Sequence, residues 1–379
     1  MTIHFNVPYL TGRELEYLER VIGNRAFAGN GPFTKEVAAW LEQRYGVPRV
    51  LLTHSCTAAL EMAALLLDLG PDDEVIIPSY TFPSTAAAFL RVGARSVFCE
   101  IDPETMMIDP ADAARRVTAA TRAIVPVHYG GIACDMDAIM SLAKEHGLTV
   151  VEDAAQGLEA SLNGRWLGTI APLGCLSFHE TKNLHAGLAG ALFLNDPSFA
   201  ERAEAIWERG TDRQKALKGL IDKYTWVEVG SSFYPSELQA GFLLAQLESI
   251  DRNLAERRAL YEAYRQGLTP MAEANRLHLP RLDPGRQLNY HACYVIFNSA
   301  ADCDDVREHL RSQDIWAYIG YVPLHSSPVG RRLGYKPDDL PITEEYAQRV
   351  LRLPFHNELS RDDVRRVCEA IKEYFEGRS

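Results

Sequence analysis

Two side chains at the ends of apolar runs could carry out amine chemistry. Lys182 lies near the end of the segment "GCLSFHETKN" (residues 174–183), and Asp153 closes the apolar run "LTVVED". A lysine is a nucleophile, able to form a Schiff base, only when burial or a neighbouring cation lowers its pKa. A carboxylate opposite such a lysine could keep the pyridine nitrogen of an electron-sink cofactor protonated. Taken alone, Lys182 could be a surface lysine and Asp153 the cap of a following helix.

Hydroxyl-bearing residues near two further apolar runs could bind a phosphate. Ser55 and Thr57 flank Cys56 at the start of a predicted helix that follows the run "VLLTHS". The free N–H groups and the dipole at such a helix start attract a phosphate, although simple capping is the alternative. Ser177, five residues before Lys182, could supply another hydroxyl to the same phosphate.

An aromatic residue completes the set of candidates. Phe82 follows the run "IIPSYT", and its ring could stack on a planar heteroaromatic ring, although an isolated aromatic is more often part of the core. A phosphate site, a ring, an acid for a pyridine nitrogen and a lysine for an aldehyde together predict a pocket for pyridoxal 5'-phosphate.

These residues need a scaffold that brings strand ends together. From residue 49 to residue 196, short apolar runs alternate with helical patterns, for example "EVIIPS" followed by "STAAAFLRVG". Near-continuous Val, Ile and Leu strands between amphipathic helices are typical of a mainly parallel sheet with both faces covered. Ligands bind beyond the carboxyl ends of the strands in such sheets, where the candidate residues lie. The first strand is not followed by G-x-G-x-x-G, which argues against a dinucleotide-binding oxidoreductase.

The remainder of the chain predicts a second, smaller α/β domain. Residues 236–267 keep a helical apolar period and are predicted to form a long helix that joins two domains. Beyond it, the strand "HACYVIFN" and helices at 302–312 and 360–376 follow, with a loose stretch at 280–291. We therefore expect a large domain of residues 1–250, including the N-terminal segment, and a small C-terminal domain of residues 251–379.

Composition restricts the class of protein. The chain has 379 residues, of which 47% are hydrophobic and 24% charged, as in globular proteins with more than one core. A net charge of -12 without a block of Lys and Arg argues against nucleic-acid binding. No run approaches the roughly 18 apolar residues of a membrane helix, and no leader is evident, which predicts a cytoplasmic protein. Seven cysteines without a C-x-x-C pair predict buried, reduced thiols and no metal site.

The segments that hold the candidate residues resemble those of a known family. "VEDAAQ" (residues 151–156), "SFHETKN" (177–183), "PSYTFPSTAAA" (78–88) and "YVPLH" (321–325) resemble the DegT/StrS-type nucleotide-sugar aminotransferases, and the resemblance runs over essentially the whole chain. It implies an α/β protein of aminotransferase fold type I, with a large domain built on a mainly parallel seven-stranded sheet and a smaller C-terminal domain. It also implies a homodimer with active sites shared between the chains.

The resemblance assigns roles to the candidates around the cofactor ring. Lys182 would hold the cofactor and later shuttle a proton, and Asp153 would pair with the pyridine nitrogen. Phe82 would stack on the ring, and Gln156 would contact its oxygen side. The phosphate would be held by Ser177 and by the loop of Ser55, Cys56 and Thr57.

The resemblance also indicates where the chain departs from its relatives. Many relatives send an asparagine into the neighbouring subunit's phosphate site; Ser232 stands there, which predicts a weakened contact. Residues 187–190 read Gly-Leu-Ala-Gly where many relatives have Gly-Glu-Gly-Gly, which removes an acid and one freely rotating residue. Tyr321 and His325 lie in the sugar-facing motif of the family, with a core role as the alternative for each.

The substrate follows from the same resemblance. The chain is most similar to members that move an amino group, by analogy from glutamate, to C4 of dTDP-4-keto-6-deoxyglucose, giving a dTDP-4-amino-4,6-dideoxyhexose. Amination at C3, a cofactor-dependent sugar dehydratase and a non-catalytic regulator are the alternatives. Dehydratase relatives can carry histidine in place of the lysine, whereas Lys182 is present here. The altered loop at residues 187–190 is the only feature that favours a regulator.

Overall fold

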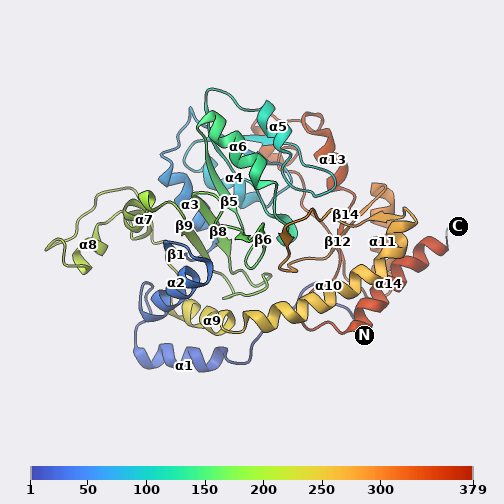
Figure 1. The fold of residues 1–379 in the computed structure, drawn as a ribbon, viewed down its shortest axis with the longest axis horizontal. Helices are drawn as coiled ribbons and strands as arrows, with labels where there is room; N and C mark the ends of the chain where they lie inside the picture. Colours follow the sequence, from blue (N-terminus) through green and yellow to red (C-terminus); the bar gives the residue numbers. More distant parts are fainter. Residues whose placement is uncertain (1, 378–379) are drawn as a thin grey trace.

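A seven-stranded sheet forms the centre of the larger part of the protein. The computed structural model describes residues 2–377 (Figure 1). The strand order is β1-β9-β8-β5-β4-β2-β3, and only β9 runs antiparallel to its neighbours. The predicted mainly parallel sheet is therefore confirmed. Its strands are β1 (Arg49–Thr53), β2 (Glu74–Pro78), β3 (Arg95–Cys99), β4 (Thr121–Ile124), β5 (Thr149–Asp153), β8 (Leu173–Ser177) and β9 (Gly190–Leu194).

Helices cover both faces of this sheet, which explains why its strands are apolar throughout. Because side chains alternate along a strand, Leu51 and Leu192 pack on one face, whereas Val50 and Phe193 pack on the other. The first face carries α3 (Cys56–Leu66), α4 (Pro83–Leu90) and α7 (Ala200–Trp207), and the second carries α2 (Pro32–Tyr45), α5 (Pro110–Arg115), α6 (Met136–His146) and α9 (Glu237–Leu247).

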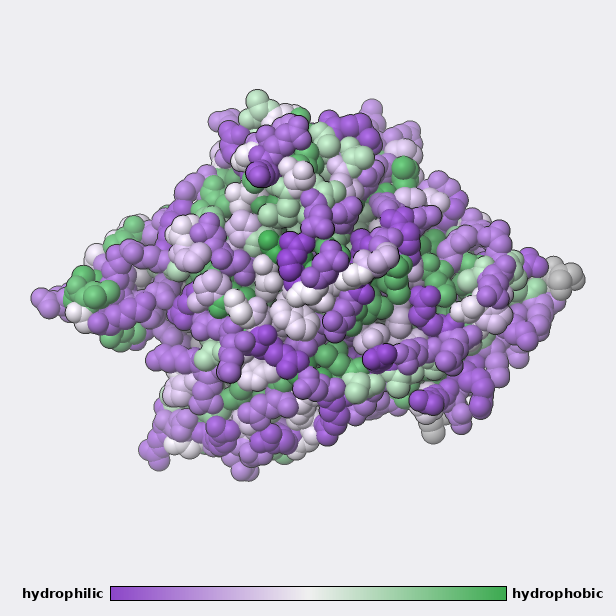
Figure 2. All heavy atoms as spheres, in the orientation of Figure 1, coloured by the Kyte–Doolittle hydropathy of each residue, from purple (hydrophilic) through white to green (hydrophobic). Residues whose placement is uncertain are grey.

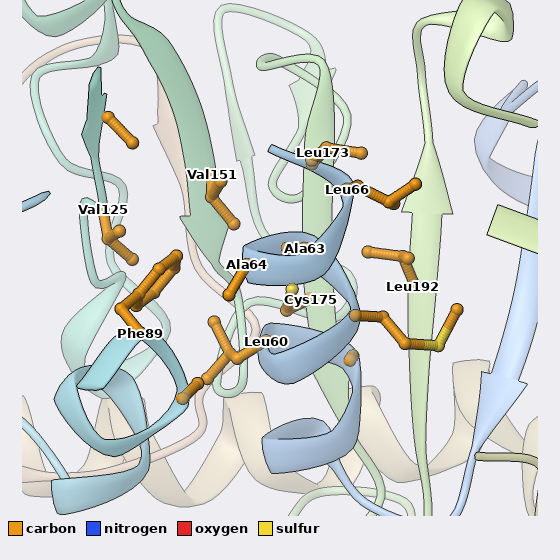
Figure 3. Packing of buried hydrophobic residues seen from close by; sticks show 14 of the residues in the cluster. Leu60, Ala63, Ala64, Leu66, Phe89, Val125, Val151, Leu173, Cys175 and Leu192 are labelled. Atoms are coloured by element: carbon orange, nitrogen blue, oxygen red, sulfur yellow. The ribbon is translucent and has the colours of Figure 1, made fainter. Parts of the chain in front are cut away.

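Helix α3 is buried on nearly all sides and is anchored at its start. The Ser55 hydroxyl oxygen accepts the Ala58 N–H at 3.1 Å, which caps the helix, and the Ala and Leu residues that follow are strong helix formers. Figure 3 shows Leu60 and Ala64 facing Phe89 of α4 and Val151 of β5. Truncating a buried leucine such as Leu60 to alanine costs about 2–5 kcal/mol. This packing fixes the start of α3 at the carboxyl end of β1.

The segment predicted as one long helix contains two. Helix α9 ends at Leu247, and α10 (Ile250–Glu273) begins after a break at residues 248 and 249. The Glu248 carboxylate accepts a hydrogen bond of 2.8 Å from Arg13, which precedes α1 (Glu14–Asn24), and one of 2.5 Å from Tyr17 of α1. The prediction of a single helix was wrong because α9 packs against α1 and α2, whereas α10 packs against α14 of the C-terminal part.

The C-terminal part is built on a four-stranded sheet of order β10-β12-β14-β13. The N-terminal segment reaches it, because Ile3 pairs with Ile315 in a parallel bridge. The predicted strand in "HACYVIFN" and the two predicted helices are confirmed; the division near residue 250 stays a prediction. The elements are β10 (Leu277–His278), β12 (Tyr294–Phe297), α11 (Ala300–Ser312), β13 (Tyr318–Ile319), β14 (Val350–Arg352) and α14 (Arg361–Glu376).

Short elements complete the described chain. All seven cysteines are free and buried, as predicted.

Within residues 2–377, no helix is long and apolar enough to cross a membrane, and no group of three or more His, Cys, Asp or Glu side chains could hold a metal ion. The short elements are β6 (Ser161–Leu162), β7 (Arg165–Trp166), α8 (Arg213–Leu217), β11 (Arg286–Gln287), α12 (Pro328–Arg332) and α13 (Pro341–Ala347).

Candidate active site

Lys182 lies in a turn beyond the carboxyl end of β8. Its backbone N–H donates to the His179 carbonyl at 2.8 Å, and the amine of this half-buried residue has no hydrogen bond or ion pair with any described residue. Burial lowers the pKa of the amine, and the positive charge of Arg352 acts in the same direction, against the opposing influence of Cys56 and Asp153. The amine is therefore closer to its neutral, nucleophilic form than that of an ordinary lysine.

Asp153 ends β5, the strand beside β8, and is buried with 4% of its surface exposed. The Thr85 hydroxyl donates to its Oδ2 at 2.8 Å, and the Ala155 N–H donates to its Oδ1 at 3.1 Å. Burial raises the pKa of this carboxyl, and no Lys or Arg of the described chain pairs with it. The residues that follow form turns rather than a helix, so the alternative of a helix cap is wrong.

Gln156 and Phe82 both contact Tyr321. Gln156 accepts the Gly130 N–H at 2.7 Å and donates to the Tyr321 hydroxyl at 2.9 Å, which fixes the orientation of its amide. The centroid of the Phe82 ring lies 6.2 Å from that of Tyr321, and 57% of Phe82 is exposed. Phe82 is therefore not a core residue, and its ring is free to stack on a planar ligand.

The predicted phosphate residues meet at the start of α3. The N–H groups of the first turn lack partners within a helix, and Ser55 satisfies one of them. The Thr57 hydroxyl donates to Ser84 at the start of α4 at 2.7 Å. Ser177 pairs with Gly190 across β8 and β9, and a side chain at Gly190 would place its Cβ 2.5 Å from the Cys56 nitrogen. The absence of that side chain lets the ends of β8 and β9 approach the helix start.

The altered loop at residues 187–190 has a regular shape. The Phe178 N–H donates to the Ala189 carbonyl and the Glu180 N–H donates to the Gly187 carbonyl, both at 2.8 Å, so β8 and β9 are joined by a hydrogen-bonded connection. Gly187 has a φ of 71°, which glycine adopts without strain. Ala189 is buried among apolar residues, and Leu188 is exposed. The loop is therefore held by backbone hydrogen bonds although its sequence departs from the family pattern.

The structure does not bring His325 into the site. Its ring is fully buried; Nδ1 lies 2.7 Å from the Ser79 hydroxyl and Nε2 lies 3.2 Å from the Pro337 carbonyl. Both ring nitrogens are engaged because the chain turns inward at Leu324, whose N–H donates to the Ser79 carbonyl. The core alternative holds for His325, and the expected sugar contact is replaced by a structural one.

Ser232 lies outside the pocket of its own chain. It is exposed and forms a bridge with Glu208 at the base of an arm, residues 209–232, that includes α8 and projects from the large sheet (Figure 1). Figure 2 shows apolar side chains at the tip of this arm. Its exposed apolar residues are Leu217, Leu220, Tyr224, Trp226, Val227 and Val229.

Four residues of the site were missed by the sequence analysis. Thr85 stands at the start of a helix that follows a strand, so the reasoning applied to Ser55 could have found it. The Asn183 side chain donates to the Asn289 carbonyl at 2.7 Å, and its Oδ1 lies 2.9 Å from Nδ1 of His291. Asn289 and His291 line a narrow crevice with Lys182 and hold its turn in place. Asn289 and His291 lie in the loose stretch of residues 280–291, whose sequence has no periodic pattern that would have indicated them.

These residues fit pyridoxal phosphate. The unpaired amine of Lys182 could take the aldehyde, and the buried carboxylate of Asp153, which lacks a cation, could receive the charge of a pyridine N–H. Phe82 offers an exposed ring face, and the start of α3 offers N–H groups and hydroxyls where a phosphate binds. The chemistry of the whole donor set therefore agrees with the cofactor predicted from the sequence.

Comparisons with known proteins agree with this geometry. The sequence model of the "DegT/DnrJ/EryC1/StrS aminotransferase family" matches residues 8–372. A "pleiotropic regulatory protein" of Geobacillus stearothermophilus is 34% identical, covering 90% of this chain and 87% of its own. A dTDP-4-dehydro-2,3,6-trideoxy-D-glucose 4-aminotransferase of Saccharopolyspora spinosa is 30% identical, covering 99% and 97%. The aminotransferase TlmJ of Streptoalloteichus hindustanus superposes over all of both chains with a TM-score of 0.91 at 30% identity, which confirms fold type I.

Proposed function

Because the chain belongs to the DegT/DnrJ/EryC1/StrS aminotransferase family and is a pyridoxal-phosphate-dependent nucleotide-sugar aminotransferase, we propose that it aminates C4 of dTDP-4-keto-6-deoxyglucose with glutamate as the donor. The product is a dTDP-4-amino-4,6-dideoxyhexose, as for a dTDP-4-amino-4,6-dideoxygalactose transaminase. The observation that best supports transaminase activity is the unpaired amine of Lys182 beside the buried Asp153. The relative that acts at C4 of a dTDP sugar supports the acceptor.

The cofactor is held by residues at the strand ends. Lys182 takes the aldehyde, Asp153 pairs with the pyridine nitrogen, Gln156 contacts the ring oxygen and Phe82 stacks on the ring. When bound, pyridoxal phosphate supplies an electron sink and carries the amino group from donor to acceptor. The phosphate is held by Ser55, Cys56, Thr57 and Ser177.

Lys182 also moves the proton. With the cofactor and the donor bound, its free Nζ would act as a general base that accepts the proton of the glutamate α-carbon and holds it for delivery. In the second half of the reaction, the same Nζ would act as a general acid and deliver a proton to C4 of the sugar. Asn183, with Asn289 and His291, keeps the turn of Lys182 in place throughout.

The active enzyme is a homodimer in this proposal. The arm of residues 209–232 exposes apolar side chains, among them Trp226 at 74%, and a second copy of the chain would cover them. Ser232 at the base of the arm then contacts the phosphate in the partner's site. A cytoplasmic location is part of the same proposal, and the buried free thiols are typical of proteins of reducing compartments.

Visible absorption of the purified protein tests the reaction class. With pyridoxal phosphate, a yellow band should form in the wild type and fade when glutamate is added; Lys182→Ala should not form it. Adding dTDP-4-keto-6-deoxyglucose should restore the band and yield an amino sugar. A band that persists with glutamate would contradict glutamate as donor, and equal turnover by Lys182→Ala would overturn the role of the lysine.

The structure of the product separates the remaining alternatives. Nuclear magnetic resonance of the product distinguishes an amino group at C4 from one at C3. A dehydratase would release a sugar that has lost water and gained no nitrogen. A regulator would bind the cofactor without turnover; the dTDP sugar is then a ligand rather than a substrate.

A further inference from the structure

Arg352 is the last residue of β14, at the boundary between the two sheets. Because side chains alternate along a strand, Arg352 points to the same side as Val350, which packs with the large sheet, and away from Leu351, which packs in the C-terminal core. Its Nε donates to the Ile319 carbonyl at 3.3 Å. The guanidinium is therefore directed from the small sheet toward the candidate site.

Two aromatic rings hold the guanidinium in position. The Arg352 Cζ lies 5.1 Å from the ring centroid of Phe5 and 5.8 Å from that of Tyr321, within the range of cation–π contacts. Tyr321 in turn contacts the Phe82 ring and the Gln156 amide. A single side chain thus separates Arg352 from the two residues expected to contact the cofactor ring.

The charge of Arg352 is not neutralised by the protein. Among residues 2–377, no carboxylate forms an ion pair with it, and its Nη1 and Nη2 have no acceptor. It is half-buried, and its charge lowers the pKa of Lys182 and of His291. Partial burial of an unpaired guanidinium costs desolvation free energy, which an anion arriving with a ligand would offset. A guanidinium presents a planar pair of N–H groups that matches a carboxylate or phosphate.

We propose that Arg352 binds an anionic group of a substrate, a carboxylate or a phosphate, through its two terminal nitrogens. The inference rests on the proposed function, in which each substrate carries such a group. Glutamate has carboxylates, and a nucleotide sugar has a diphosphate. The chemistry is shared, and the two sources are distinguished by experiment.

Binding of two unreactive ligands to the cofactor-loaded protein tests the proposal without turnover. Calorimetry with glutarate represents the donor, and calorimetry with thymidine diphosphate represents the sugar nucleotide. Arg352→Gln should weaken the binding of one ligand by about 10- to 100-fold, as expected for loss of a charged hydrogen-bonding pair. The affinity for the other ligand should be unchanged. The ligand that weakens identifies the source. Unchanged affinity for both would overturn the proposal.

Matched variants separate this effect from a loss of structure. Arg276 directly precedes the edge strand β10 of the small sheet and is also held by an aromatic side chain, since its Cζ lies 5.9 Å from the Phe375 ring centroid. Arg276→Gln should leave both affinities unchanged. If Arg352→Gln does not fold, Arg352→Lys keeps the charge and removes the planar fork; it should weaken the same ligand severalfold, and an unchanged affinity would overturn the proposal.

The outcome is independent of whether the proposed reaction is correct. If no amino sugar forms but Arg352→Gln binds thymidine diphosphate or glutarate more weakly than the wild type does, the proposed function is wrong and the anion site is supported. If the amino sugar forms and neither ligand weakens, the anion site fails alone.

Discussion

The hydroxyl of Thr85 donates a hydrogen bond of 2.8 Å to the carboxylate of Asp153. This bond joins the first turn of α4 to the end of β5, and the Thr81 hydroxyl lies 2.9 Å behind it. The carboxylate proposed to meet the pyridine nitrogen is thus oriented by a neighbouring helix. Hydrogen bonds to charged groups contribute about 1.5–3 kcal/mol.

Replacing Thr85 by valine should therefore weaken the binding of pyridoxal phosphate by about tenfold or more. Valine keeps the shape of the side chain and removes the hydroxyl. Fluorescence titration of the apoprotein measures the affinity. Thr269→Val is a matched control, because the Thr269 hydroxyl donates only to the Arg265 carbonyl within α10. Equal affinities in the wild type and Thr85→Val would show that Asp153 needs no such support.

The buried carboxyl of Asp153 should make apoprotein stability depend on pH. Its pKa in the folded state is raised, so the folded protein binds a proton over the range between the unfolded value of about 3.9 and the folded pKa. The stability that Asp153 contributes is full below that range and is lost as pH rises through the folded pKa. Urea unfolding from pH 4 to 8 should show wild type losing stability relative to Asp153→Asn.

Asp196→Asn provides a control whose effect does not change over this pH range. Hydrogen bonds from Ser198 lower the pKa of the exposed Asp196, so the stability that this residue contributes is lost only as pH falls below its unfolded pKa of about 3.9. The difference between wild type and Asp196→Asn should therefore stay constant from pH 4 to 8. Asp153→Asn should also bind pyridoxal phosphate more weakly. A pH-independent difference between wild type and Asp153→Asn would contradict the buried, protonatable carboxyl.

Gly190→Ala should damage the phosphate site more than the fold. The added methyl would lie 2.5 Å from the Cys56 nitrogen, so the backbone at the start of α3 must move. Such overpacking costs about 1–3 kcal/mol of stability. The preference for pyridoxal phosphate over pyridoxal, measured as a ratio of dissociation constants, should fall. Gly23→Ala is the control, since no atom lies within 4 Å of its Cβ; a retained phosphate preference in Gly190→Ala would place the phosphate elsewhere.

Tyr321→Phe and His325→Ala should have different consequences. Tyr321→Phe removes the hydroxyl that receives the Gln156 amide, so cofactor or sugar affinity should fall severalfold with little loss of stability. His325→Ala leaves the Ser79 hydroxyl without its partner in the core and should cost about 1–3 kcal/mol of stability with unchanged sugar affinity. Thermal unfolding and sugar titration distinguish the two. A sugar affinity that falls only in His325→Ala would reverse this assignment.

Mixed dimers can test whether Ser232 acts in the partner's site. Ser232→Ala should weaken the binding of pyridoxal phosphate severalfold. The same substitution at the exposed neighbour, Ser231→Ala, should leave the affinity unchanged. A dimer of one Lys182→Ala chain and one Ser232→Ala chain should then have one site of wild-type affinity, because that site combines an intact lysine with the partner's intact serine. Weakened binding in that mixed dimer would mean that Ser232 acts within its own chain.

The sequence by itself determined the sheet and the position of the two candidate residues, Asp153 and Lys182, at the ends of its strands. Continuous apolar strands such as "EVIIP" form only where helices cover both faces, and this local pattern places Asp153 and Lys182 at the same edge. The family motifs around those residues identified the cofactor. These signals are local, because each strand and its following residue are contiguous in the chain.

Tertiary structure decided the features that depend on distant segments. The break at residues 248 and 249 accompanies the packing of α9 and α10 against different segments, and Glu248 contacts Arg13, 235 residues away. Asn289 and Arg352 reach the site from the C-terminal part because two sheets meet there, and no periodicity marks them. His325 lies in the expected motif, yet a turn of the chain buries both of its ring nitrogens. Sequence patterns specify which residues share a strand end, whereas packing between domains decides which side chains finally face the ligand.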